Sequence, residues 1–278
     1  MTTTPHPEAP PTASGFFGEA RTGDLVALAL AAVIASLVLS DWPVAIGTWL
    51  GNDIFVRYWP RLAEGLGVTL QLVAISIVLG GLLSLPLALA RFRNRGFAST
   101  LAYGYVYFFR GTPLLAQTFL VYYGAGEFSD TLRGIGLWGF FKEAYWCVLL
   151  TFSLNTAAYQ AEILAGAIRA VPRGQWEAAH ALGLSKPVAF VKIILPQAFV
   201  TALRPYGNEV ILMIKGSAVA SVVTVFDLMG ATRLAANRTF DEQVYLWAAV
   251  VYLLLVETIR RVWDLIERGL TRHLRRRA

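Results

Sequence analysis

The sequence predicts an all-α integral membrane protein with about six transmembrane helices. Of its 278 residues, 56% are hydrophobic and only 15% are charged, and the mean hydropathy is +0.55. A soluble domain of this length has too little interior to bury so much apolar surface, and about one quarter of an ordinary soluble domain is charged. A lipid bilayer is therefore the expected solvent. The composition argues against disorder, a coiled coil and a soluble nucleic-acid-binding protein, despite a pI of 9.6.

The membrane crossings follow the uncharged runs of the sequence, since a spanning helix needs about 20 apolar residues. Residues 1–23 are rich in proline and have no apolar period, which predicts a disordered cytoplasmic tail. Residues 24–42 predict a short first span. The six expected spans are Leu25–Ser40, Gly65–Ala90, Gly96–Gly126, Ala144–Ala161, Ile193–Val225 and Val244–Val256.

The distribution of lysine and arginine predicts that both termini are cytoplasmic. Placing the N-terminus inside puts most of the 24 basic residues on the cytoplasmic side, where short loops are enriched in them. Much of the net charge of +6 lies in Arg260–Ala278, which has seven arginines against Asp264 and Glu267. We expect the basic tail, residues 271–278, to lie where anionic head groups attract it.

Residues 169–196 fall on the expected cytoplasmic side, yet their sequence is typical of a folded segment. Gln175–Leu182 is a run of good helix formers. Gly183 can adopt the left-handed conformation that ends a helix, and Pro187 suits the start of the next one. The sequence predicts a short helix outside the membrane at about residues 175–184, joined by a sharp turn to the fifth span.

The same segment carries a resemblance. Glu-Ala-Ala begins at Glu177, the glycine follows at position 183, and a Leu-Pro pair stands at residues 195–196. In residue type and spacing this resembles the EAA motif of permease subunits of bacterial ABC importers. The resemblance implies that the short helix docks in a groove of a cytoplasmic ATPase and passes nucleotide-driven movement to the spans. The alternative is a cytoplasmic linker helix that matches by chance. The implied coupling residues are Glu177, Ala178, Ala179 and Gly183.

More of the chain, about residues 60–270, is similar to one branch of these permeases, that of the polar amino acids. Arg110–Gln117 (RGTPLLAQ) and Ala157–Glu162 (AAYQAE) resemble sequences of that branch. Within the branch, Tyr145–Leu150, Leu154–Tyr159 and Asn208–Met213 look most like permeases for histidine, other basic amino acids and opines. Departures at Lys215–Val219 and Leu164–Gly166 weaken the inference about substrate. The branch shares a five-helix type I ABC importer core, so the first span resembles an N-terminal addition.

The resemblance implies a transport subunit of the bacterial cytoplasmic (inner) membrane, and not an enzyme. It implies a second permease subunit, the same or homologous, two copies of an ATPase, and an extracytoplasmic substrate-binding protein, with an amino acid as substrate. The outer segments 41–60, 127–143 and 228–243 would receive the binding protein. The sequence has no phosphate-binding P-loop, so ATP-Mg belongs to the partner ATPase. Three scattered histidines and Cys147 indicate no metal site and no cofactor of this chain's own.

Polar residues recur at helical spacing inside the predicted spans. Asn155, Tyr159 and Glu162 share one stripe of the fourth span. Ionisable groups are costly in a bilayer, so they face a water-filled path or a partner. The candidate substrate-path residues are Arg110, Gln117, Asn155, Tyr159, Glu162, Asn208, Glu209 and Lys215. An equally weighted alternative is that the four charged members pair with each other and hold the helices together.

A second hypothesis comes from another class of transporter. An ion-coupled secondary transporter would use Glu162 and Glu209 as proton or ion sites, as intramembrane carboxylates often serve. It would need no ATPase, so the presence of a partner ATPase separates the two.

Overall fold

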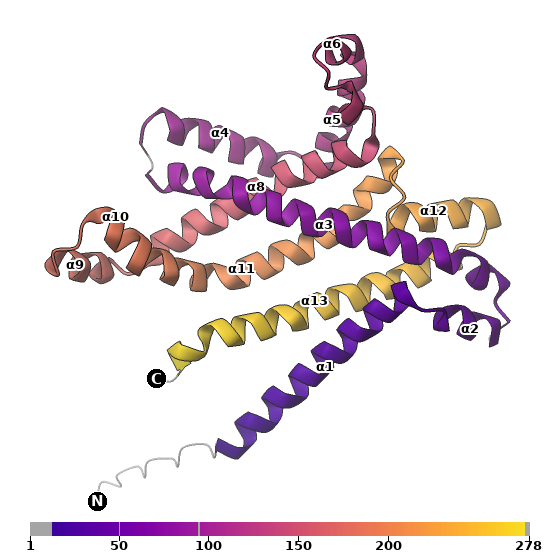
Figure 1. Cartoon of the computed structure of the whole chain (residues 1–278), viewed down its shortest axis with the longest axis horizontal. Coiled ribbons are helices and arrows are strands. Elements are labelled where there is room, and N and C mark those ends of the chain that lie inside the picture. Colours follow the sequence, from indigo (N-terminus) through magenta and orange to yellow (C-terminus); the bar gives the residue numbers. More distant parts are fainter. Residues whose placement is uncertain (1–12, 50, 94, 276–278) are drawn as a thin grey trace, which may run out of the picture.

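The computed structural model describes residues 13–49, 51–93 and 95–275, and all regular secondary structure in these ranges is helical. The all-α prediction is therefore confirmed for the described chain. Figure 1 shows long helices running along one general direction, with short helices gathered at either end. The elements are α1 (Ala13–Leu39), α2 (Trp42–Trp49), α3 (Asp53–Arg93), α4 (Phe97–Gly111), α5 (Leu114–Glu127), α6 (Ser129–Gly134), α7 (Trp138–Phe141), α8 (Ala144–Ala170), α9 (Arg173–Ala181), α10 (Lys186–Ala189), η1 (Phe190–Ile194), α11 (Leu195–Gly216), η2 (Ser217–Val223), α12 (Leu228–Thr239) and α13 (Gln243–Arg275).

Three described helices are long and apolar enough to cross a membrane. They are α3, the continuous segment Lys186–Val223, and Gln243–Thr271 within α13. The α1–α2 pair makes a fourth if its 80° bend lies within one span. The expected third and fourth spans do not meet this criterion, because α4 and α5 are each short and α8 carries many polar residues.

The ends of the chain differ from the sequence expectation. Helix α1 begins at Ala13, so it extends into the segment 1–23 that was expected to be a disordered tail. Alanine, glutamate and arginine, all present in residues 13–23, are good helix formers and favour continuation of the helix beyond the span. Residues 1–12 lie outside the described residues. Helix α13 likewise continues to Arg275, into the expected tail 271–278, of which residues 276–278 are not described.

Two segments that the sequence analysis expected on the outer side are more structured than loops. Segment 127–143 contains α6 and α7, and segment 228–243 contains α12. Asp227 caps α12, because its carboxylate accepts a hydrogen bond from the Gly230 N–H at 2.9 Å. The Leu228 N–H donates to the Thr69 hydroxyl oxygen at 3.0 Å and ties α12 to α3.

Two prolines shape the helices around the centre. Pro113 separates α4 from α5 and so divides the expected span Gly96–Gly126. Proline breaks a helix because it has no backbone N–H to donate to the preceding turn. Pro196 begins α11. The turn before it is a π-helix, in which the N–H of Leu195 donates to the carbonyl of Phe190.

Helix α8 is the centre of the packing. It makes its most extensive contacts with α3, and it also packs against α11, α5 and α4. Gly80 of α3 allows the closest approach, because a Cβ at this position would collide with the side chain of Thr156 and crowd the backbone at Ser153 and Ala157. Small residues at such crossings let helix backbones meet in a bilayer.

We predict that Gly80→Leu lowers the stability of the protein by about 2 kcal/mol, because the added side chain must displace the α8 backbone. For a protein of this size that corresponds to a fall in Tm of about 4–8 °C, measured by thermal unfolding in detergent. Gly67→Leu is the matched control, since no atom lies within 4 Å of a Cβ built there. Equal Tm values for the two variants would contradict the close α3–α8 crossing.

Candidate functional site

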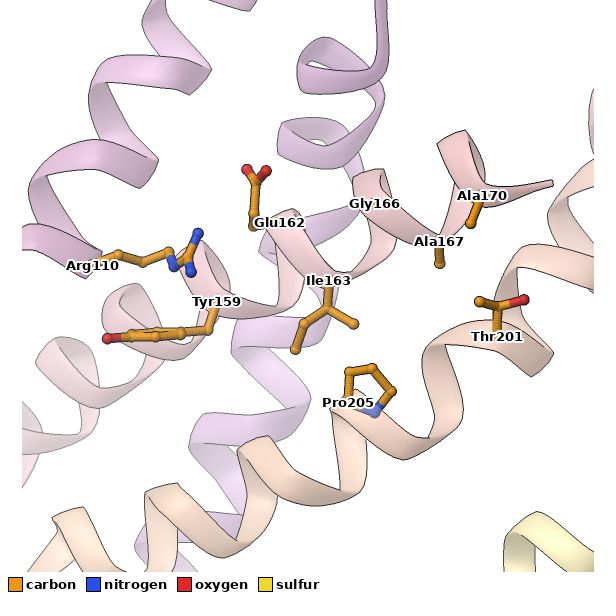
Figure 2. A pocket seen from close by; sticks show the side chains of 9 residues that line it. All are labelled: Arg110, Tyr159, Glu162, Ile163, Gly166, Ala167, Ala170, Thr201 and Pro205. Carbon is orange, nitrogen blue, oxygen red and sulfur yellow. The ribbon is translucent and has the colours of Figure 1, made fainter.

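A pocket of about 360 Å³ lies beside α8, between the end of α4 and the middle of α11. Arg110 comes from α4, and Thr201 and Pro205 come from α11. Figure 2 shows the latter two facing the α8 residues of the opposite wall. Tyr159 and Glu162 are the polar α8 residues of the pocket. The other α8 residues of the pocket are small or apolar, so its charged and aromatic groups are confined to the side formed by Arg110, Tyr159 and Glu162.

Arg110 and Tyr159 are brought together by the fold. The Arg110 Cζ lies 5.2 Å from the centroid of the Tyr159 ring, which is a cation–π arrangement. Figure 2 shows the guanidinium stretched along the ring face. Arg110 is exposed, and this contact holds its guanidinium against the face of the Tyr159 ring.

Glu162 forms ion pairs that the sequence did not predict. Its Oε2 lies 2.8 Å from Arg91 Nη2, and its Oε1 lies 3.7 Å from Arg169 Nη1. The Arg91 and Glu162 side chains are 14% and 26% exposed, so this pair is largely shielded from water. The hypothesis that Glu162 pairs with Arg110, Glu209 or Lys215 is wrong for the described residues. One sequence signal was available: Arg169 follows Glu162 by seven residues, on the same helix stripe.

A second pocket of about 280 Å³ adjoins the first. Its polar walls are Arg91, Tyr103, Tyr107, Arg110 and Glu162. Arg91 lies over the Tyr103 ring at 5.0 Å. Both pockets include Arg110 and Glu162, so these two side chains stand between the two spaces, and Arg91, the partner of Glu162, lines the second.

Gln117 and Asn155 meet away from these pockets. The Asn155 Nδ2 donates to Gln117 Oε1 at 3.0 Å and to the Phe109 carbonyl at 3.0 Å. The Gln117 Nε2 donates to the carbonyls of Phe109 and Thr112 at 2.9 and 3.1 Å. These carbonyls lie at the α4–α5 break, where Pro113 supplies no N–H. The two amides therefore satisfy the broken helix, which a bilayer requires.

The three remaining path candidates lie on α11 and are not brought into either pocket. Glu209 is 5% exposed and accepts a hydrogen bond from the Thr156 hydroxyl of α8 at 2.8 Å. Asn208 and Lys215 are exposed and line neither pocket. The structure thus assembles Arg110, Tyr159 and Glu162 at the pockets, brings Gln117 and Asn155 together elsewhere, and places the three α11 candidates outside both pockets.

The short helix expected at residues 175–184 is α9. Glu177 and Ala178 are exposed, whereas Ala179 is 1% exposed and packs inward. Gly183 has a φ of 72°, the left-handed conformation expected just after the helix. The sequence reasoning missed Leu182, whose 76% exposure adds an apolar side chain to the outer surface of α9. The available signal was the position of Leu182 itself, an apolar residue between the end of α9 and Gly183.

No group of His, Cys, Asp and Glu suited to a metal ion occurs among the described residues. The site is therefore one of arginines, carboxylates and aromatic rings on membrane helices, with an exposed helix at one end of the bundle. These features define a helical transport protein of the membrane.

Comparison with known proteins identifies the class. The model of the binding-protein-dependent transport system inner membrane component matches residues 80–275, and the chain belongs to this family. The nopaline transport system permease protein NocM of Agrobacterium fabrum (strain C58 / ATCC 33970) is 40% identical over 226 residues, 81% of this chain and 94% of that protein. The arginine ABC transporter permease protein ArtM of Escherichia coli (strain K12) is 37% identical over 212 residues, 76% of this chain and 95% of that protein.

Solved structures agree with the fold. A crystal structure of an amino acid ABC transporter with histidines matches with a TM-score of 0.68 and 32% identity, over 77% of this chain and 96% of that chain. An inward-facing form of the MetNI methionine ABC transporter matches with a TM-score of 0.64 and 19% identity, over 76% of this chain and 96% of that chain, which supports the fold alone. The family match begins at Gly80 within α3, so α1 and α2 precede it.

We predict that Glu162→Gln lowers stability by about 1–2 kcal/mol, because Arg91 then loses its charged partner inside the bundle. The measurement is thermal unfolding of the purified protein. The control is Glu143→Gln, whose carboxylate lies 3.8 Å from Lys142 with 59% of the side chain exposed, where an ion pair contributes little. If Glu162→Gln were as stable as the control, the Arg91–Glu162 ion pair would make no measurable contribution to the stability of the protein.

Proposed function

We propose that the chain is the transmembrane permease subunit of an ATP-driven ABC importer for polar amino acids, with basic amino acids and opines as the favoured substrates. The observation that carries this proposal is family membership over residues 80–275. Relatives named for nopaline, octopine and arginine transport support the substrate class, as does similarity to an amino acid transporter crystallised with histidines.

Helix α9 is the proposed contact with the partner ATPase. Glu177 and Ala178 face outward for docking, Ala179 holds α9 on the bundle, and Gly183 provides the turn that sets its angle. Leu182 adds apolar surface beside them. ATP and Mg²⁺ are bound by the ATPase, which performs the hydrolysis.

The pocket beside α8 is the proposed substrate site. Arg110 presents N–H donors suited to an amino acid carboxylate. Tyr159 offers a ring face to a cationic side chain or ammonium, and Glu162 lines the same pocket in its ion pairs with Arg91 and Arg169. At about 360 Å³ the pocket lies at the small end of ligand sites, which suits an amino acid. Asn208 and Lys215, exposed on α11, are proposed to face a path shared with the second permease.

The proposed assembly has two permease subunits, two ATPase copies and an extracytoplasmic binding protein in the bacterial inner membrane. Figure 1 supports cytoplasmic termini, because the described start of α1 and the end of α13 lie toward the end of the molecule that carries α9. The segments containing α2, α6, α7 and α12 are proposed to receive the binding protein. Figure 1 shows α2 and α12 at the end of the molecule opposite to α9, and α6 at the top of the view.

The ion-coupled alternative is not favoured. Glu162 is paired with two arginines, and Glu209 is bound by the Thr156 hydroxyl. Neither carboxylate stands alone in a pocket as an ion site, and family membership points to ATP-driven transport.

The coupling role is tested with Glu177→Lys and Gly183→Val in the complex reconstituted with its ATPase. We expect ATP-driven amino acid uptake to fall by about tenfold or more in both, because one reverses a docking charge and the other strains the left-handed turn. Membrane insertion should be unchanged. Glu64→Lys is the control, because Glu64 is exposed on α3, away from α9 and outside the segments proposed to receive the binding protein. Normal uptake in both α9 variants would refute the coupling helix.

Substrate class is tested in the same complex by ATP hydrolysis with a panel of amino acids delivered by the binding protein. Arginine, histidine and opines should stimulate hydrolysis more than neutral amino acids do. Stimulation by neutral amino acids alone would contradict the substrate proposal and leave the coupling proposal standing.

A further inference from the structure

Three aromatic side chains connect α9 to the end of α3. Phe92 lies in the last turn of α3, Trp176 is on α9, and Phe190 begins η1. Their ring centroids are 6.2 Å apart in each of the three pairs, and the planes of Phe92 and Trp176 differ by only 9°. All three are half-buried against the core around Ile168 and Ile194. We call Phe92, Trp176 and Phe190 the aromatic triad.

The residue next to Phe92 is Arg91, which holds the ion pair of the candidate site. Its guanidinium donates to Glu162 Oε2 from both Nε and Nη2, at 3.1 and 2.8 Å. Its backbone carbonyl accepts a hydrogen bond from Arg169 Nη2 at 2.8 Å. The last turn of α3 is thus held by α8 through Arg91 and by α9 through Phe92.

This arrangement makes the ion pair sensitive to the position of α9. Consecutive helix residues move together, so a shift that displaces Phe92 also displaces Arg91. Packed rings pass displacement on because protein interiors have low compressibility. A helix end also opens at lower cost than a helix centre. Arg91 lines the 280 Å³ pocket, and Glu162 lines both pockets, so movement of the pair changes the space between them.

We propose that Phe92, Trp176 and Phe190 are positioning residues that convert movement of α9 into breaking or forming of the Arg91–Glu162 ion pair, and so control access between the two pockets. This inference rests on the proposed function, because it needs an ATPase to move α9. Gln197, which donates to Gln175 Oε1 at 3.2 Å, gives α9 a separate contact with α11. Loss of the aromatic triad therefore leaves α9 attached to the bundle.

The test uses the complete complex with Phe92→Ala. We expect basal ATP hydrolysis and ATPase binding to stay within about twofold of wild type, and uptake to fall by about tenfold or more. Phe92→Tyr keeps the ring and should retain most uptake. Phe97→Ala is the matched control, since Phe97 is 79% exposed at the start of α4. Normal uptake by Phe92→Ala in a preparation whose wild-type complex is active would overturn the inference and spare the proposed function.

A merely structural role is separated by combining Phe92→Ala with Arg91→Gln. If the aromatic triad acts through Arg91, the double variant should lose no more uptake than Arg91→Gln alone. If the fold-loss of uptake in the double variant equalled the product of the losses in the two single variants, Phe92 would act independently of Arg91, which would overturn the inference.

A further readout needs no ATPase. In the purified permease, the Tm shifts of Phe92→Ala and Glu162→Gln should be non-additive, whereas those of Phe97→Ala and Glu162→Gln should add. Additive shifts in both pairs would overturn the connection between the aromatic triad and the ion pair. A wild-type complex that shows no ATP-driven uptake would overturn the proposed function and the role of the aromatic triad in transport with it, whatever the Tm values.

Discussion

The constraint on which the structure depends is that α8 must be surrounded by other helices. It carries Asn155, Thr156, Gln160 and Glu162 in a segment too polar to face lipid along its length. Each finds a partner on a neighbouring element: Gln160 Nε2 donates to the Ile77 carbonyl of α3 at 3.1 Å, and Thr156 donates to Glu209 of α11. The core of a bilayer contains no water that could hydrogen-bond such groups, so they need partners within the protein. Enclosure of α8 therefore sets how closely α3, α4, α5 and α11 pack.

The same enclosure creates the candidate site and its connection to α9. Where the surrounding helices do not close completely on α8, pockets remain beside Glu162, and Arg91 from the end of α3 reaches in to pair with it. The chain continues from α8 directly into α9, so the helix that holds the site also leads to the proposed ATPase contact. Site and coupling surface are in this way parts of one packed unit.

The sequence was sufficient for features that depend on local pattern. Uncharged runs located the apolar spans in α1, α3, α11 and α13, but they did not show that the expected third and fourth spans would fall short of a membrane crossing. Gly183 and Pro187 located the ends of short helices because each acts on its own backbone. The pairing of Glu162 depends instead on Arg91, 71 residues away, and on how α3 crosses α8. A polar residue type also does not reveal its role: Gln117 and Asn155 were expected to line a path, yet their amides donate hydrogen bonds to backbone carbonyls at the break beside Pro113. Helix α12 was missed because it is only 12 residues long and its sequence, LMGATRLAANRT, has no strong apolar periodicity.

The central claim is that the pocket beside α8 is accessible under the control of α9, and thiol labelling at Gly166 tests it most directly. Gly166 is exposed in the pocket wall with open space for a side chain, and the native Cys147 is fully buried. Gly166→Cys in the reconstituted complex would be labelled with a membrane-impermeant thiol reagent, with and without a non-hydrolysable ATP analogue. The account predicts a change in labelling rate of about tenfold or more on nucleotide binding, abolished by Glu177→Lys. An identical rate in both nucleotide states would contradict it.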